Sequence, residues 1–111
     1  MRGDMSCWHE PFGEVWYQGE SPDWPRLQPE SVRTPGLTYQ SRWAELLSDA
    51  SRGPVFIKDF PHFIHALWSD DFLGHFTHSF LIRDPAKTIT SMHDKWPDFH
   101  EAEVGFCLLY T

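Results

Sequence analysis

The sequence has little basic charge and no long apolar run. Its 111 residues include nine Lys and Arg against sixteen Asp and Glu, which gives a formal net charge of −7 at pH 7. Nonspecific binding to nucleic acid or anionic lipid depends on basic surfaces, so the composition argues against both partners. The longest uninterrupted apolar stretch, residues 106–110, is far shorter than the roughly 20 residues that cross a bilayer. We therefore expect no transmembrane helix, no membrane partner and no nucleic-acid partner.

Cysteine is also scarce. Cys7 and Cys107 are the two cysteines of the chain, and neither belongs to a CxxC motif. They could form one disulfide, but two reduced thiols are more typical of a protein without a secretory signal. Residues 1–6 contain no apolar segment of the kind that a signal peptide requires. These features favour a cytoplasmic protein.

The remaining composition is typical of a folded chain. Hydrophobic residues make up 41% and aromatic residues 16% of the sequence, too many for a disordered chain. We interpret residues 1–111 as one small domain. Within it, residues 18–36 contain four of the nine prolines and show neither helical nor strand periodicity. This segment is predicted to be an exposed loop, either a lid or partner surface or a plain insertion.

Short apolar runs alternate with helical patterns along the chain. The runs at residues 4–8, 54–58 and 79–83 are predicted to be strands, the last two being rich in β-branched and aromatic residues. Residues 39–50 carry apolar side chains at helical spacing and predict an amphipathic helix. Residues 61–76 are predicted to contain two short helical turns.

The expected helices have recognisable starts. Ser69 or Asp70 is expected to cap the second of the two short turns. After the third strand, Asp84 is a typical N-cap residue. Pro85 suits the first helical position, because the N–H that proline lacks would be unpaired there. A last helical segment is expected from Asp98 onward.

Strands that alternate with helices indicate an α/β fold with a parallel sheet. Three strands make a thin sheet, and both of its edges are expected to be open. We therefore interpret the chain as an incomplete domain, a portion of something larger. An open edge also allows self-association through strand pairing.

In an open α/β sheet, ligands bind beyond the carboxyl ends of the strands. The residue pairs at these ends are His9-Glu10, Lys58-Asp59 and Arg83-Asp84. At the third end, Lys87 and Ser91 follow Arg83 on one flank of the expected helix. A guanidinium, an ammonium and a hydroxyl beside free backbone N–H groups can bind an anion. The alternative is a surface arginine that pairs with the neighbouring Asp84 carboxylate.

Two other features have alternative interpretations. Glu10 could form an acid/base pair with His9, although a glutamate at a strand end more often caps the next turn. The histidine pairs His62/His65 and His75/His78 have the spacing of metal ligands. No acidic residue or cysteine has a companion spacing, so we expect no metal site.

Residues 79–91, Ser-Phe-Leu-Ile-Arg-Asp-Pro-Ala-Lys-Thr-Ile-Thr-Ser, resemble the 3′-phosphate-binding segment of the P-loop sulfotransferases. In that family a strand ends in Arg, a Pro follows after one residue, and a Ser lies eight positions after the Arg. Arg83, Pro85 and Ser91 match this pattern. The resemblance extends over nearly the whole chain to a divergent branch of the family, through His-Glu-Pro-Phe at 9–12, Lys-Asp at 58–59 and residues 95–106.

The resemblance implies the fold and activity of the family. The expected fold is a partial three-layer parallel sheet of the P-loop sulfotransferase type, with flanking helices. The expected activity is transfer of a sulfuryl group from 3′-phosphoadenosine-5′-phosphosulfate (PAPS) to a hydroxyl or amine of a small-molecule acceptor. Arg83 and Ser91, with Lys87 beside them, would bind the nucleotide.

The resemblance also implies a catalytic set. Lys58 would place its ammonium over the bridging oxygen as negative charge develops on the leaving phosphate. In the cytosolic branch a histidine follows this lysine by two positions, and here Phe60 stands in that place. His62 or His9 is therefore expected to take the acceptor proton.

One part of the family pattern is missing. The sequence contains no GxxxxGK[ST] match and no Arg/Ser/Thr-rich loop to surround the 5′-phosphosulfate. We therefore expect this truncated chain to be catalytically inactive alone. The alternative function is that of a noncatalytic interaction or regulatory remnant of the same fold.

Overall fold

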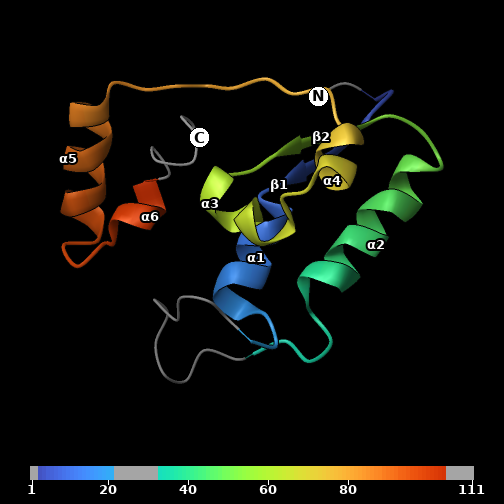
Figure 1. The fold of residues 1–111 in the computed structure, drawn as a ribbon, viewed down its shortest axis with the longest axis horizontal. Coiled ribbons are helices and arrows are strands. Elements are labelled where there is room, and N and C mark those ends of the chain that lie inside the picture. Colours follow the sequence, from blue (N-terminus) through green and yellow to red (C-terminus); the bar gives the residue numbers. More distant parts are fainter. Residues whose placement is uncertain (1–2, 22–32, 105–111) are drawn as a thin grey trace. The chain divides into compact units, whose positions relative to one another are not determined.

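The structure, a computed structural model, describes residues 3–21 and 33–104. The chain forms two compact units, Met1–Ala66 and Leu67–Thr111, and each is described by itself (Figure 1). Much of the predicted loop at 18–36, the end of the predicted last helix and Cys107 lie outside the described residues. The interpretation of the whole chain as one incomplete domain stays a prediction.

Two short parallel strands form the sheet of the first unit. β1 spans Ser6–His9 and β2 spans Val55–Lys58, and they lie side by side in Figure 1. In both strands exposed side chains alternate with half-buried ones, as the two-residue period of a strand requires. The strands confirm the predictions at 4–8 and 54–58 to within two residues. Their parallel pairing, with helices between them in the chain, confirms an α/β arrangement.

A helix that the sequence analysis did not predict, α1 (Pro11–Gln18), follows β1 directly. It buries Phe12 and Val15 on one side. Gly13 lies on the same side, where a Cβ atom would stand 2.9 Å from the ring of Phe63. Only glycine allows this close approach without a shift of the ring.

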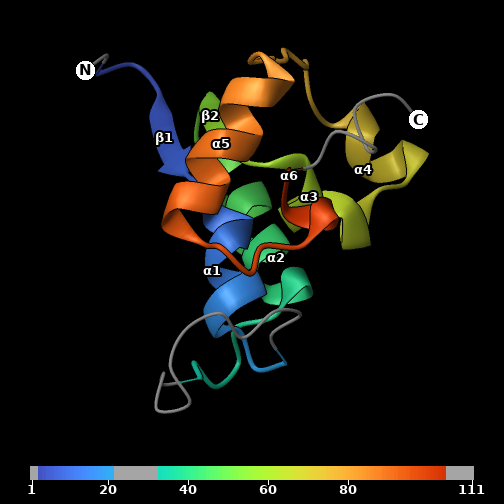
Figure 2. The same ribbon diagram turned by 90° about the vertical axis from the view of Figure 1, so that its left-hand side faces the viewer.

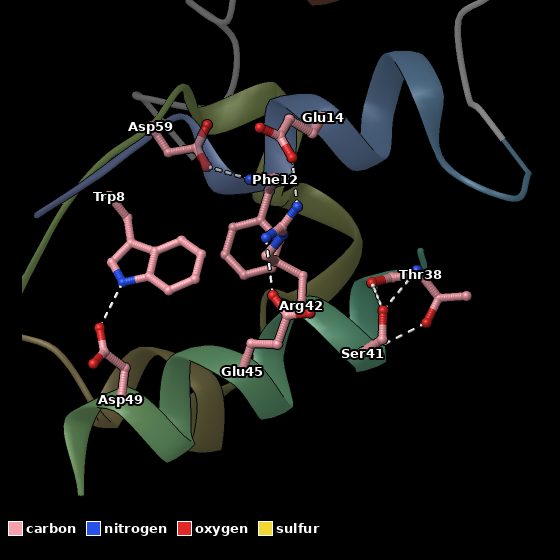
Figure 3. Close-up of polar contacts among 9 residues, drawn as sticks. All are labelled: Trp8, Phe12, Glu14, Thr38, Ser41, Arg42, Glu45, Asp49 and Asp59. Carbon is pink, nitrogen blue, oxygen red and sulfur yellow. Dashed lines mark hydrogen bonds and ion pairs between the residues drawn. The ribbon is translucent and has the colours of Figure 1, made fainter. Parts of the chain in front are cut away.

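The predicted amphipathic helix is confirmed as α2 (Tyr39–Ala50). Thr38 and Ser41 form a capping box at its start: Ser41 N donates to Thr38 Oγ1 at 3.0 Å, and Thr38 N donates to Ser41 Oγ at 2.9 Å (Figure 3). This exchange satisfies two backbone N–H groups that the helix leaves unpaired. Leu46 is buried on the inner side of the helix.

Two polar side chains of α2 attach it to its neighbours (Figure 3). The Asp49 carboxylate accepts hydrogen bonds from Ser6 Oγ at 2.5 Å and from Trp8 Nε1 at 2.7 Å, both in β1. These two bonds, that of Ser6 above all, lower the pKa of Asp49. Arg42 donates to Glu14 of α1 at 2.5 Å. The sheet and the helices α1 and α2 are therefore joined by directional contacts as well as by packing.

The chain then forms α3 (Pro61–Ile64) and a 3₁₀ turn (His65–Leu67), where the first short helical turn was predicted. Phe63 of α3 completes the apolar core of the first unit. Its ring centroid lies 5.8 Å from that of Trp16 and 5.6 Å from that of Tyr17.

The second unit contains three helices among its described residues: α4 (Asp70–Gly74), α5 (Pro85–Lys95) and α6 (Glu101–Val104). Ser69 Oγ caps α4 by accepting from Phe72 N at 3.1 Å. Asp84 caps α5 by accepting from Ala86 N at 2.9 Å, as predicted. The helices α5 and α6, orange and red in Figure 2, contact each other. None of the described helices combines the length and apolar character that a membrane span requires.

The prediction of a third strand at residues 79–83 is wrong. These residues belong to neither helix nor strand, and the sheet has two strands. Phe80, Leu81 and Ile82 are 67%, 100% and 56% exposed. A strand exists only through its ladder of hydrogen bonds, and no described residue pairs with this segment, so β propensity alone does not produce one.

The packing of the first unit predicts a strong effect of truncating Phe12. Its side chain is 1% exposed, so Phe12→Ala should lower the free energy of unfolding by about 3–5 kcal/mol through lost burial and a residual cavity. Phe80→Ala removes the same atoms from an exposed position and should change stability by less than about 1 kcal/mol. Urea denaturation followed by circular dichroism measures both variants. Equal losses would contradict the assignment of Phe12 to the core.

Candidate functional site

The carboxyl ends of β1 and β2 bring together two of the residue pairs that the sequence singled out. The register places His9 opposite Lys58. The Lys58 ammonium forms an ion pair and hydrogen bond with the Glu10 carboxylate, and Nζ lies 4.0 Å from the ring centroid of Phe60. His9 Nε2 lies 3.4 Å from Glu10 Oε1. Glu10 thus contacts both Lys58 and His9 at this edge.

Glu10 has an uncommon backbone conformation. Its φ of 49° and ψ of 52° are left-handed, and among the described residues it is the one non-glycine residue with positive φ. Its N–H donates to the Lys58 carbonyl at 2.7 Å, and its own carbonyl accepts from Gly13 N at 3.0 Å. A left-handed conformation costs free energy in a residue with a Cβ atom, and such strain concentrates at functional positions.

Glu10 precedes α1 but makes no side-chain cap, contrary to the more common interpretation of a strand-end glutamate. Asp59 caps the start of α1 instead. Its carboxylate accepts from Phe12 N at 2.9 Å and from Phe60 N at 2.8 Å, and the first of these bonds ties the start of α1 to the end of β2 (Figure 3). No role was predicted for Asp59, although it directly follows the strand-end lysine in the sequence.

Burial raises the pKa of Asp59 to about 6, although its two backbone hydrogen bonds act in the opposite direction. The nearby Glu10 carboxylate raises this pKa further, while the Lys58 ammonium lowers it. A carboxyl group with a strongly perturbed pKa at the carboxyl edge of a parallel sheet is a marker of a functional site. This edge holds the Lys58 ammonium and two half-buried carboxyl groups, those of Glu10 and Asp59.

The two histidines proposed as bases occupy different environments. His62 lies on α3 and is 5% exposed. Its ring packs among aromatic rings, with centroids 4.2 Å from Phe63 and 5.4 Å from Trp16. The side chain of His9 is 79% exposed at the end of β1. An acceptor molecule can reach His9, whereas His62 serves as a packing residue.

The second unit brings together the three predicted anion-binding residues. Arg83, Lys87 and Ser91 line one open hollow of about 500 Å³ along α5. The rest of its wall is formed by Ala86, Thr90, Asp94 and Lys95. Asp84 is engaged as the helix cap, and Arg83 forms no ion pair with any described acidic residue. The alternative interpretation, an Arg83–Asp84 surface pair, therefore does not describe this geometry.

The histidines of the second pair, His75 and His78, contact backbone carbonyls. In the second unit, His75 Nδ1 lies 2.7 Å from the Asp71 carbonyl and His78 Nε2 lies 2.9 Å from the Leu73 carbonyl. Within residues 3–21 and 33–104, no three His, Cys, Asp or Glu side chains are grouped to hold a metal ion.

Comparison of the chain with protein-family models, with curated proteins and with solved structures found no match in any of the three.

The raised pKa of Asp59 predicts a pH-dependent stability. In the unfolded chain the group titrates near 3.8 and in the folded protein near 6, so between these values the folded state binds more protons. The contribution of Asp59 to the free energy of unfolding should therefore fall as the pH rises from about 4 to about 6, by up to about 3 kcal/mol.

Urea denaturation of the wild type and Asp59→Asn at several pH values from 4 to 7 measures this contribution as the difference between two curves. The wild type should lose stability relative to the variant over this range, because asparagine does not titrate. Parallel curves would show that Asp59 has an ordinary pKa.

Proposed function

We propose that this chain is a sulfotransferase-like protein, a partial three-layer parallel sheet of the P-loop sulfotransferase type. Its family activity is transfer of a sulfuryl group from PAPS to a hydroxyl or amine of a small-molecule acceptor. The observation that carries this proposal is the gathering of Arg83, Lys87 and Ser91 around one hollow along α5. These are the residues that the resemblance assigns to the nucleotide.

The hollow suits a terminal phosphate. The Arg83 guanidinium offers a planar pair of donors that matches phosphate oxygens, Lys87 adds a second positive charge, and Ser91 adds a hydroxyl donor. Arg83 precedes α5 and Lys87 lies in its first turn, where the helix dipole favours negative charge. Ser91 lies about one turn further along the helix. Asp94 lies in the last turns of the helix, so its repulsion favours a phosphate at the Arg83 end.

The strand edge of the first unit carries the residues that the resemblance assigns to catalysis. The Lys58 ammonium can stabilise the charge that develops on the leaving phosphate. Of the two candidate bases, exposure favours His9 over His62. Because the sequence has no phosphate-loop motif, we propose that the 111 residues alone bind the nucleotide without transferring sulfate.

Adenosine 3′,5′-bisphosphate is the probe that tests this proposal, because it carries the 3′-phosphate without a transferable group. Isothermal titration calorimetry should detect binding to the wild type. Arg83→Ala should weaken the binding about 10- to 100-fold through loss of a charge-assisted contact, and Ser91→Ala should have a smaller effect. The control Arg33→Ala removes the same charge from an exposed position and should leave the Kd within twofold. Equal affinities of the Arg83 and Arg33 variants would exclude the proposed nucleotide site.

A second candidate function, noncatalytic self-association, is favoured by the segment at residues 79–83. Its apolar side chains Phe80, Leu81 and Ile82 are exposed together, and its backbone forms no hydrogen bond with the described residues. An extended apolar segment of this kind can pair with a strand edge of a second copy.

Self-association predicts a sedimentation coefficient that rises with protein concentration. Leu81→Lys should abolish this rise by placing a charge in the paired segment. Leu47→Lys, at an exposed position of α2, should not. A wild type that remains monomeric at all concentrations would contradict this second function.

A further inference from the structure

The ammonium that the proposed function assigns to the sulfate donor already has an anionic partner. The Glu10 carboxylate contacts Lys58 Nζ directly, and the ammonium also lies over the Phe60 ring. The side chains of Lys58 and Glu10 are 44% and 29% exposed. A solution anion can therefore reach the ammonium from the open side of the sheet edge.

The two carboxylates at this edge differ in what holds them. Asp59 accepts from two backbone N–H groups, those of Phe12 and Phe60, so its departure would leave both donors unpaired. Glu10 makes no side-chain cap, and its carboxylate contacts only side chains, Lys58 and His9, among the interactions of the described residues. Of the two, Glu10 is the carboxylate that can turn aside without breaking a backbone hydrogen bond.

The backbone keeps Glu10 beside Lys58. The Glu10 N–H donates to the Lys58 carbonyl, and the Glu10 carbonyl accepts from Gly13 N. These bonds hold the residue in its left-handed conformation, in which glycine would be more stable. The Glu10 side chain is therefore kept beside the Lys58 ammonium at a cost in stability. This cost indicates that the Glu10 carboxylate has a function.

We propose that Glu10 is an internal competitor for the anion site of Lys58, and that its carboxylate occupies the ammonium until an oxyanion of the sulfate or phosphate class displaces it. The inference rests on the proposed role of Lys58 toward the donor. Exposed ion pairs are weak, so a multiply charged ligand can displace Glu10, whereas a small anion competes poorly. The Glu10–Lys58 contact thus lowers the affinity of Lys58 for weakly binding anions.

Inorganic sulfate is the probe for the test, followed by two-dimensional ¹H–¹⁵N NMR at the amides of residues 57–60. Glu10→Gln keeps the size of the side chain and removes its charge, so it should bind sulfate about 5- to 10-fold more tightly at these amides than the wild type does. Glu45→Gln removes the same charge elsewhere on the first unit and should stay within twofold of the wild type. The double variant Glu10→Gln/Lys58→Ala should not show this increase in sulfate affinity.

Glu10→Gly serves as a second variant, because its positive φ suits glycine and the protein should fold at least as stably. It should reproduce the gain in sulfate affinity. If Glu10→Gln and Glu10→Gly both bind sulfate as weakly as the wild type, or if the gain survives in the double variant, the proposed competition is wrong.

Adenosine 3′,5′-bisphosphate added to the same samples separates this inference from the proposed function. If the bisphosphate leaves the amides of residues 83–91 unchanged while Glu10→Gln gains sulfate affinity, the proposed nucleotide site is wrong. The competition between Glu10 and anions at Lys58 is then supported, and Lys58 binds an anion other than the sulfate donor. If the bisphosphate perturbs residues 83–91 while Glu10→Gln gains nothing, the competition is overturned and the nucleotide site stands.

Discussion

The parallel pairing of β1 with β2 determines the geometry of everything at the strand edge. Each strand has four residues, too few for their ladder to be stable by itself. Contacts from outside the sheet hold the strands together: Asp49 of α2 bonds to Ser6 and Trp8 of β1, and Asp59 after β2 bonds to the start of α1. The resulting register places Glu10 beside Lys58. The contact between these two side chains therefore depends on the packing of α1 and α2 against the strands.

The two carboxyl groups at this edge show how environment separates similar side chains. Asp59 is half-buried between β2 and α1, where it accepts two backbone hydrogen bonds and has a raised pKa. Glu10 lies one residue beyond the opposite strand and faces the ammonium instead. Asp59 thus makes the helix-capping bond expected of Glu10, whose backbone is left-handed and whose side chain makes no cap.

Sequence patterns predicted the parts of this fold that are specified locally. Helix α2, the Ser69 cap and the Asp84-Pro85 start of α5 all depend on residues within one or two turns. Helix α1 was missed because it has eight residues and a glycine near its start, although Phe12 and Val15 have helical spacing. The strand at 79–83 was wrong because strand formation requires a partner that propensity does not reveal. In the site, the sequence placed Glu10 and Lys58 at the ends of two strands, but their contact depends on which strands pair. The capping role of Asp59 depends on backbone geometry.

The net negative charge of the chain limits which anions its cationic groups can bind. With a formal net charge of −7, long-range attraction of anions is absent, so binding must come from contacts within about one Debye length, roughly 8 Å at physiological salt. The α5 hollow meets this requirement with Arg83 and Lys87 side by side. The strand edge offers one ammonium that an internal carboxylate already neutralises. An anion displaces the Glu10 carboxylate at that edge only if it carries more negative charge and more acceptor oxygens than a glutamate side chain. A phosphosulfate or diphosphate group has both properties.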